Sequence, residues 1–182
     1  MGRDKPGLSW AGEPLLSRVI ARLAPLTDTV WVSARPGQAL PAGAFVRVDD
    51  RRPGEGPLAG LAAGLAAIGG AGPVAVAACD YPFADPALFA AIRRAAPGAP
   101  VALPVHAGRR HPLMAIWRAD AADACEVALA RGVRRVRAVL EEIGAVELAV
   151  ERLVGFDPGR ALLNVNDPDA LELARRLDRP EA

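Results

Sequence analysis

The 182-residue sequence is poor in cysteine and in long apolar runs, and each shortage excludes a class of protein. No apolar run approaches the roughly 18 residues that a membrane-spanning helix needs, and no charged start followed by an apolar stretch marks a signal peptide. The two cysteines, Cys79 and Cys125, lack Cys-x-x-Cys spacing. They indicate reduced, buried residues and not a disulfide or a zinc site. We therefore expect a cytoplasmic protein without a membrane partner.

Excess charge is also absent. Lysine and arginine together number 22 against 21 acidic residues, and hydrophobic residues make up 52% of the chain. This balance argues against disorder and against a broad surface for nucleic acid. Only Lys5 is a lysine in a chain otherwise rich in arginine. That is a weak hint that position 5 needs a compact ammonium group, and chance retention is the alternative.

Short apolar strands alternate with amphipathic helices along the chain. The run from Val74 to Cys79 is typical of a strand buried on both faces. Two strands, Pro100 to Val105 and Leu113 to Trp117, are close enough in sequence to form an antiparallel pair. We also expect a helix over residues 133–143 and a last short strand from Leu162 to Val165. The order predicts one α/β domain over residues 1–182, with three layers and a mostly parallel mixed sheet.

Asp80 follows the buried strand, at the end where open α/β sheets bind ligands. It is predicted to bind a metal or to lie beside a phosphate. The alternative is a helix cap or an Asx-turn. A second candidate is the helix start at Gly56, Pro57 and Leu58, whose free N–H groups suit an anion. Its alternative is an ordinary helix packed tightly on a sheet.

Three polar groups follow later in the chain. The helix predicted over residues 133–143 has a cluster of cations at its start, which would oppose the helix dipole and favour a phosphate-bearing ligand or an acidic partner over a merely solvated face. His111, next to Arg109 and Arg110, could line an anionic site, or these residues could form a solvated hairpin tip. On a strand, Asn164 and Asn166 would share a face and could ligand a cation or a phosphate; capping the last helix is the alternative. The cation cluster consists of Arg131, Arg134, Arg135 and Arg137.

These sequence features occur together in one protein family. The chain resembles the molybdenum cofactor guanylyltransferases, the MobA family within the GT-A-like, Rossmann-like nucleotidyltransferases. Each motif alone is weak, but the five stand in family order and cover nearly the whole chain. They are Met1-Gly2-Arg3-Asp4-Lys5, Gly56-Pro57-Leu58-Ala59-Gly60, Cys79-Asp80-Tyr81-Pro82-Phe83, His111-Pro112 and Asn164-Val165-Asn166-Asp167-Pro168.

The resemblance implies a reaction that joins GMP from GTP to molybdenum-bearing molybdopterin, releases pyrophosphate and requires Mg²⁺. Asp80 would hold Mg²⁺, and Lys5 would contact the triphosphate; both would be catalytic. The rest of the nucleotide site would consist of Ser33, Asp50, Gly56, Pro57 and Leu58. The molybdopterin side would consist of His111, Arg134, Arg135, Asn164 and Asn166. Other proteins of cofactor biosynthesis and molybdoenzyme chaperones are further expected partners.

One departure concerns the start of the chain. The family has a strand and a glycine-rich LAGGxSxR loop before the segment that corresponds to Met1–Lys5. We therefore expect this polypeptide to bind GTP weakly or not at all and to be poorly stable. Three functions stay open: a guanylyltransferase, a related cytidylyltransferase or sugar-phosphate nucleotidyltransferase, and an inactive truncated homologue that only binds the cofactor or a partner.

Overall fold

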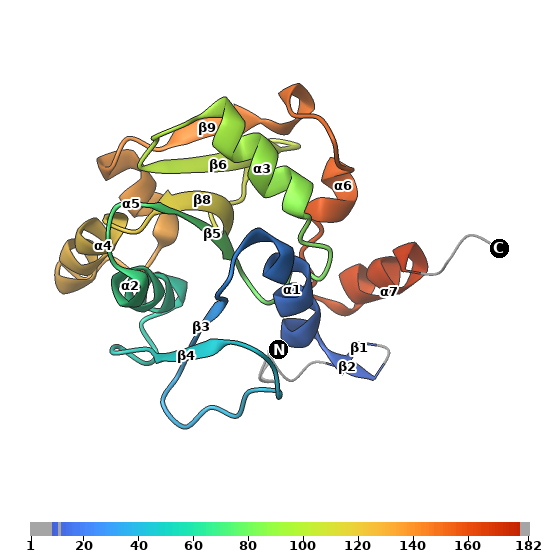
Figure 1. Cartoon of the computed structure of the whole chain (residues 1–182), viewed down its shortest axis with the longest axis horizontal. Coiled ribbons are helices and arrows are strands. Elements are labelled where there is room, and N and C mark those ends of the chain that lie inside the picture. Colours follow the sequence, from blue (N-terminus) through green and yellow to red (C-terminus); the bar gives the residue numbers. More distant parts are fainter. Residues whose placement is uncertain (1–8, 11, 179–182) are drawn as a thin grey trace.

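The computed structural model describes residues 9–10 and 12–178 (Figure 1). In this part of the chain, no helix is long and apolar enough to cross a membrane. The elements in chain order are β1 (Ser9–Trp10), β2 (Glu13–Pro14), α1 (Leu15–Leu23), η2 (Ala24–Leu26), β3 (Trp31–Ala34), β4 (Val46–Asp49), α2 (Pro57–Ile68), β5 (Pro73–Ala77), α3 (Pro86–Ala95), β6 (Val101–His106), β7 (Arg109–Arg110), β8 (Met114–Arg118), α4 (Ala121–Ala130), α5 (Val136–Glu142), β9 (Val146–Ala149), η3 (Val150–Arg152), α6 (Pro158–Ala161) and α7 (Pro168–Leu177).

The principal sheet has β8 between β5 and β6, and β6 also pairs with β7 and β9. The predicted antiparallel pairing is confirmed: Val101 lies opposite Trp117 and Ala102 opposite Ile116. Only β6–β9 and β3–β4 are parallel among the described pairs. The pairs β1–β2, β5–β8, β6–β7 and β6–β8 are antiparallel. The sheet is therefore mixed, as expected, but its mostly parallel character is not confirmed.

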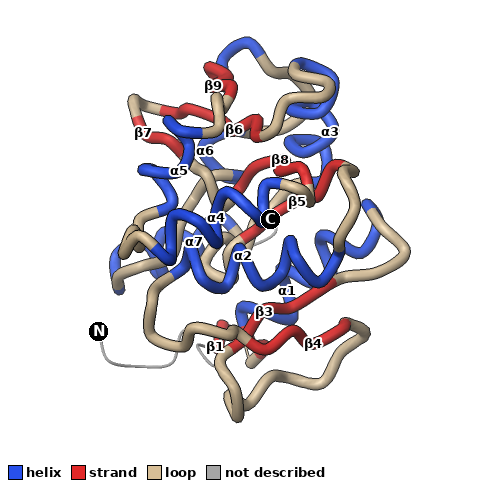
Figure 2. Tube along the Cα trace, turned by 90° about the vertical axis from the view of Figure 1, so that its left-hand side faces the viewer, coloured by secondary structure: helices blue, strands red, loops and turns tan. Residues whose placement is uncertain are grey.

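Side chains along β6 and β8 point alternately to the two faces of the sheet, and helices that cover both faces complete the three layers. Val101 and Trp117 belong to one buried cluster, which also includes residues of α2, α4 and α5. Ala102 and Ile116 point the other way, into a cluster with residues of α3 and α6. Figure 2 shows α2 and α4 together on one side of the strands. The α/β architecture thus follows from strands that are apolar on both faces.

The parallel pair β3–β4 forms a separate two-stranded sheet. In Figures 1 and 2 it lies beyond β5, on the side away from β8. Helix α1 covers it through Leu16 and Ile20, which pack against Val32 of β3. On the other side, α2 approaches so closely that a Cβ at Gly60 would lie 3.3 Å from Ser33 Oγ. The two sheets are therefore linked through helices rather than through main-chain pairing of β3 with β5.

Two sequence predictions about elements are wrong. Residues 162–165, predicted as the last strand, form a turn and coil instead, and Val165 N–H donates to Asp80 O at 2.8 Å. A single backbone hydrogen bond does not make a ladder, so the same-face argument for Asn164 and Asn166 fails. The helix predicted over residues 133–143 begins only at Val136, because the chain first turns at Gly132 with φ +85°.

Candidate active site

Asp80 lies in the turn that follows β5. The turn closes where Tyr81 N–H donates to Ala78 O at 3.2 Å, so the chain reverses around the aspartate. The hydrogen bond from Val165 N–H to Asp80 O brings the coil with Asn164 and Asn166 beside this turn. The cap of the next helix is Asp85, whose Oδ1 accepts from Ala87 N–H at 2.8 Å. Asp80 therefore does not serve as the helix cap, which was one of its two structural alternatives.

Tyr81 and His111 form a buried pair next to Asp80. The Tyr81 hydroxyl lies 3.1 Å from His111 Nδ1, and the rings meet edge to face with centroids 6.0 Å apart. Burial is the main cause that raises the pKa of Tyr81, and the charge of Asp80 adds to it. A hydrogen bond with the Asn164 side chain and the charge of Arg109 oppose that rise. These interactions bring Asp80, Tyr81, His111 and Asn164 into one cluster.

His111 is neutral at physiological pH. Its pKa is lowered to about 4, chiefly by burial and also by the electrostatic effects of Arg109 and His106. A neutral imidazole offers one donor and one acceptor nitrogen. In the tautomer with the proton on Nε2, the Tyr81 hydroxyl donates to Nδ1. The Nε2–H group then remains able to donate to a ligand oxygen.

The hairpin of β6 and β7 places two arginines in different environments. Arg110 forms an ion pair with Glu147 at 2.6 Å and lies 3.9 Å from Glu141. Arg109 is exposed and pairs with no carboxylate of the described residues, yet its charge acts on both Tyr81 and His111. Arg109 is therefore the cation of this hairpin that is available to an anionic ligand.

Oxygen ligands for a cation are present in the cluster. Asn164 Oδ1 is buried and has no hydrogen-bond partner among the described residues. Such an atom costs roughly 1–3 kcal/mol unless a ligand satisfies it. No group of three or more His, Cys, Asp or Glu side chains suited to a metal occurs in the described part of the chain. One carboxylate, one amide oxygen and substrate phosphates nevertheless fit a hard divalent cation such as Mg²⁺.

The loop between β4 and α2 contains the other predicted nucleotide-binding residues. Asp50 is buried, and its Oδ1 accepts from Arg52 N–H at 2.8 Å in an Asx-turn. Gly56 is the N-cap of α2 with φ +84°, which an L-residue rarely adopts. Pro57 then occupies the first helical position. Leu58 is completely buried in the core, so only its main chain can face a ligand.

The arginine cluster is divided between two helices. Arg134 precedes α5, and its Nη1 donates to Leu129 O at 2.9 Å, at the carboxyl end of α4. Its Nη2 donates to Glu55 Oε1 at 2.9 Å and so ties the loop before α2 to α4. A cation at a helix C-terminus is favourable, so the argument from helix-dipole repulsion fails for this residue. Arg135 is exposed at the N-cap of α5.

Three predicted residues remain. Ser33 is exposed on β3 next to Gly60, and Asn166 is exposed two residues after Asn164. Lys5 lies outside the described residues. The site residues that the family resemblance implies include neither Tyr81 nor Arg109. Tyr81 is the one tyrosine in the sequence and directly follows Asp80, which was an available signal.

Comparison with known proteins assigns the family. Residues 1–148 match the family described as the MobA-like NTP transferase domain. The chain belongs to the MobA-like NTP transferase family. It is thus an enzyme of the nucleotidyltransferase class.

Two relatives illustrate the similarity within the MobA-like family. The molybdenum cofactor guanylyltransferase of Cereibacter sphaeroides is 35% identical over 100% of this chain and 91% of that protein. The guanylyltransferase of the same name from Pseudomonas aeruginosa PAO1 is 37% identical over 97% of this chain and 88% of its own length. The resemblance seen in the five sequence motifs is therefore confirmed over nearly the whole chain.

Solved structures support the fold of the MobA-like family. The molybdopterin-guanine dinucleotide biosynthesis protein A of Archaeoglobus fulgidus is similar with a TM-score of 0.78 and 28% identity, over 97% of this chain and 91% of that one. The 2-C-methyl-D-erythritol 4-phosphate cytidylyltransferase of Thermus thermophilus has a TM-score of 0.74 at 21% identity, covering 97% and 94% of the two chains. The second likeness concerns the fold alone.

Proposed function

We propose that this chain transfers GMP from GTP to molybdopterin that bears molybdenum, and that it releases pyrophosphate. Residues 1–182 act as one nucleotidyltransferase domain in this proposal. The observation that carries it is the cluster of Asp80, Tyr81, His111 and Asn164, in a chain 35% identical to a guanylyltransferase. No feature of the described residues favours the cytidylyltransferase or the sugar-phosphate alternative over this one.

The reaction needs charge neutralisation more than proton transfer. A terminal phosphate oxygen of the acceptor attacks the α-phosphorus of GTP, the new P–O bond forms, and the bond to the pyrophosphate oxygen breaks. A phosphate monoester is largely dianionic near pH 7, so it needs no general base. A neutral His111 agrees with this mechanism, because its role is to donate a hydrogen bond and not to accept a proton.

The proposed roles follow the chemistry of the donor atoms. The Asp80 carboxylate and the Asn164 amide oxygen would hold Mg²⁺, which would neutralise phosphate charge. The nucleotide lies along Ser33, Asp50 and the Gly56–Leu58 main chain, with Lys5 on its triphosphate. The pterin phosphate lies towards His111, Arg135 and Asn166. Arg134 acts on this side only through the part of its guanidinium that Glu55 leaves accessible.

We also propose that the enzyme works in the cytoplasm and hands its product to other proteins of cofactor biosynthesis or to molybdoenzyme chaperones. These partners follow from the proposed product, a large cofactor that must reach its enzyme.

The direct test is a nucleotide panel. The purified chain is incubated with Mg²⁺ and molybdenum-loaded molybdopterin, and with GTP, CTP, ATP or UTP in turn. We expect pyrophosphate release and a guanine dinucleotide product with GTP. A product with CTP alone would replace the guanylyltransferase proposal by the cytidylyltransferase one. No product with any nucleotide would favour a homologue that only binds.

The two neighbouring hairpin arginines test which part of the site meets phosphate. Arg109→Ala should raise KM for the phosphate substrate roughly tenfold, since a charge-assisted hydrogen bond contributes about 1.5–3 kcal/mol. Arg110→Ala removes the same charge one residue away, but from a side chain already paired with Glu147. It should leave KM nearly unchanged. Equal effects of the two substitutions on KM would remove Arg109 from the proposed phosphate site.

A further inference from the structure

The hydroxyl of Tyr81 lies where the two sides of the site meet. His111 Nδ1 is 3.1 Å from it, and the Asn164 side chain also hydrogen-bonds to it. His111 belongs to the side proposed for a phosphate, and Asn164 belongs to the side proposed for a cation. One hydroxyl therefore connects the two groups, and the direction of its hydrogen bonds decides what each group offers to a ligand.

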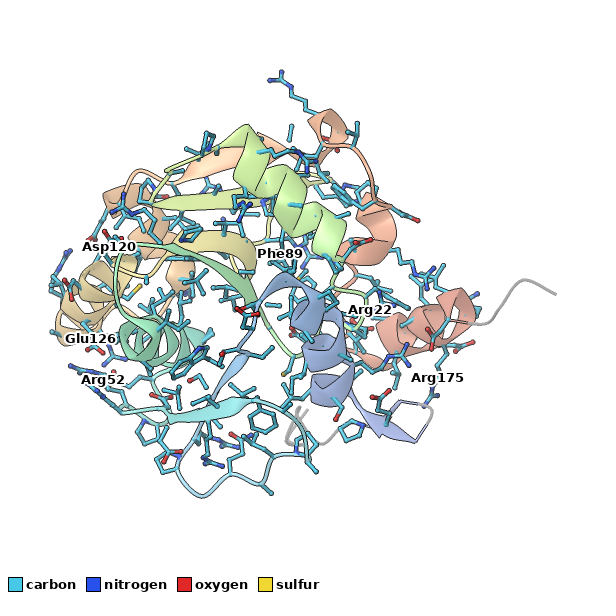
Figure 3. All side chains as sticks on the ribbon, viewed as in Figure 1. Arg22, Arg52, Phe89, Asp120, Glu126 and Arg175 are labelled. Carbon is cyan, nitrogen blue, oxygen red and sulfur yellow. The ribbon has the colours of Figure 1, made fainter. Side chains whose placement is uncertain are left out.

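The ring of Tyr81 holds this hydroxyl oxygen in place. Tyr81 is buried in the apolar cluster that includes Leu88 and Phe89 of α3, and Figure 3 shows Phe89 on that helix. The His111 ring meets the Tyr81 ring edge to face, with an angle of 74° between the two planes. Packing thus fixes the oxygen, and only the hydroxyl hydrogen can turn from one partner to another.

The acceptor of the hydroxyl hydrogen follows from the atoms around it. A buried hydroxyl needs an acceptor, because an unsatisfied buried donor costs free energy. Asn164 Oδ1 is not that acceptor, since it has no hydrogen-bond partner among the described residues. His111 Nδ1 is within hydrogen-bond distance and accepts when the neutral ring has its proton on Nε2. The Tyr81 hydroxyl therefore donates to His111.

The hydrogen bond with Asn164 has the opposite sense at the same oxygen. It lowers the pKa of Tyr81, as an N–H group that donates to a phenol oxygen does. The amide nitrogen of Asn164 therefore faces Tyr81, and its Oδ1 faces away, buried and without a partner in the described chain. The two hydrogen bonds run in one direction, from Asn164 Nδ2 to the Tyr81 oxygen and from the Tyr81 hydroxyl to His111 Nδ1.

We propose that Tyr81 is a positioning residue, which makes Asn164 present its oxygen to a cation and His111 present its Nε2–H to an anionic oxygen. This role rests on the proposed function, in which the cation is Mg²⁺ and the anion is a phosphate. Neither neighbour has a fixed polarity of its own, because an amide has two orientations and a neutral imidazole has two tautomers. Tyr81 selects one of the two states in both neighbours.

The tautomer of His111 can be observed without metal or substrate. In the ¹⁵N-labelled full chain at pH 7, a long-range ¹H–¹⁵N NMR spectrum shows which ring nitrogen has the proton. We expect the proton of His111 on Nε2. The second histidine of the sequence, His106, is the internal reference and should keep its tautomer in every variant. A proton of His111 on Nδ1 in the wild type would overturn the proposal.

Tyr81→Phe removes the hydroxyl and keeps the ring that packs against α3. The ratio of the Nε2–H to the Nδ1–H tautomer of His111 should fall about fivefold, which corresponds to the loss of one neutral hydrogen bond. The side-chain NH₂ resonances of Asn164 should shift. Those of Gln38, whose Oε1 accepts from Arg35 N–H at 3.0 Å, should stay in place. An unchanged tautomer ratio in Tyr81→Phe would contradict the proposal.

Asn164→Asp reverses the direction of the hydrogen bonds. The new carboxylate accepts from the Tyr81 hydroxyl more strongly than a neutral nitrogen does, so His111 must turn an Nδ1–H group towards Tyr81. We expect the tautomer of His111 to change from Nε2–H to Nδ1–H. This variant decides the matter even if Tyr81→Phe does not fold.

Asn166→Asp is the matched control for the added charge. It makes the same change two residues later, at an exposed side chain, and should leave the tautomer of His111 as in the wild type. A proton that stays on Nε2 in Asn164→Asp would mean that Tyr81 does not connect Asn164 with His111. Reversal in both variants would assign the effect to charge alone and would equally overturn the proposal.

Kinetics separate this role from the proposed function. In the GMP-transfer assay, Tyr81→Phe should lower kcat/KM at least about fivefold, in parallel with the change of tautomer. Wild-type kcat/KM in this variant would contradict a positioning role. If the wild-type chain forms no product with any nucleotide, the proposed function fails, while the spectra still decide whether Tyr81 fixes the polarity of His111 and Asn164.

Discussion

Asp80 is the residue on which the proposed chemistry depends most. We expect Asp80→Asn to lower kcat/KM for GMP transfer at least about 100-fold, because metal coordination stabilises transition-state charge by several kcal/mol. The substitution keeps the main-chain carbonyl that accepts from Val165 N–H, so the fold should persist. Steady-state kinetics and circular dichroism of the same preparation measure the two effects.

Asp85→Asn is the matched control. It makes the same chemical change five residues later, at a helix cap that asparagine serves as well as aspartate. Activity and stability should both remain near wild type. Comparable loss in the two variants, or full activity of Asp80→Asn, would exclude a special role for Asp80.

His111 predicts how stability depends on pH. Its pKa is lowered from 6.5 to about 4 in the folded state. The unfolded chain therefore binds more protons between these values, and the free energy of unfolding should fall as pH falls from about 6.5 towards 4. The full effect of one buried histidine is up to about 3 kcal/mol.

The variant His111→Gln cannot titrate in this range and still offers polar atoms to Tyr81. Urea unfolding of both proteins between pH 4 and 7 should show a shallower pH dependence for the variant. If both lose stability equally as pH falls, His111 is not the group responsible.

At the scale of single elements, local sequence signals succeed where the cause is local. The start of α2 at Pro57 lies where the sequence predicts it. The side-chain caps at Asp85 and Asp167 have an equally local cause, since capping and proline geometry need only neighbouring residues. The position of Arg134 could not be predicted in this way. Its partners, Leu129 O and Glu55, belong to two other segments that only the tertiary fold brings to it.

The two glycines of α2 allow a prediction at the same scale. Gly64→Ala should raise the free energy of unfolding by about 1 kcal/mol, because alanine is the better helix former and its Cβ meets nothing. Gly60→Ala gains the same helix preference, but its Cβ would lie 3.3 Å from Ser33 Oγ, so its net gain should be smaller. Urea denaturation of both variants measures the difference.

Removal of the hydroxyl tests the cause. In the Gly60→Ala background, Ser33→Ala should recover part of the missing stability, while the same change in the Gly64→Ala background should not. Equal stabilisation by the two single alanine variants would mean that the Ser33 side chain moves away from the new Cβ at no cost in folding free energy.

For the whole molecule, the sequence predicts the layers better than the connections between strands. Apolar strands and amphipathic helices in alternation identify an α/β fold, because each pattern reflects burial of that element alone. Pairing is different, since it depends on which distant strand arrives at an edge. The separation of β3–β4 from the sheet of β5, β8 and β6 therefore became visible only in the structure, as did the Tyr81–His111 contact across 30 residues.

This separation predicts uneven stability across the molecule. β6 and β8 share both buried clusters with five helices, whereas β3–β4 is held chiefly by α1 and α2, and Trp31 and Val46 remain 37% and 41% exposed. Segments with fewer buried contacts open at lower free energy. Native-state hydrogen exchange should therefore give amides of residues 31–34 and 46–49 protection factors roughly tenfold or more below those of residues 101–106 and 114–118. Ala121–Ala130 of α4, buried against the same core as β6, is the internal reference and should exchange with the slower group. Equal protection across these segments would mean that the two sheets open as one cooperative unit, despite the cavity of about 750 Å³ between them.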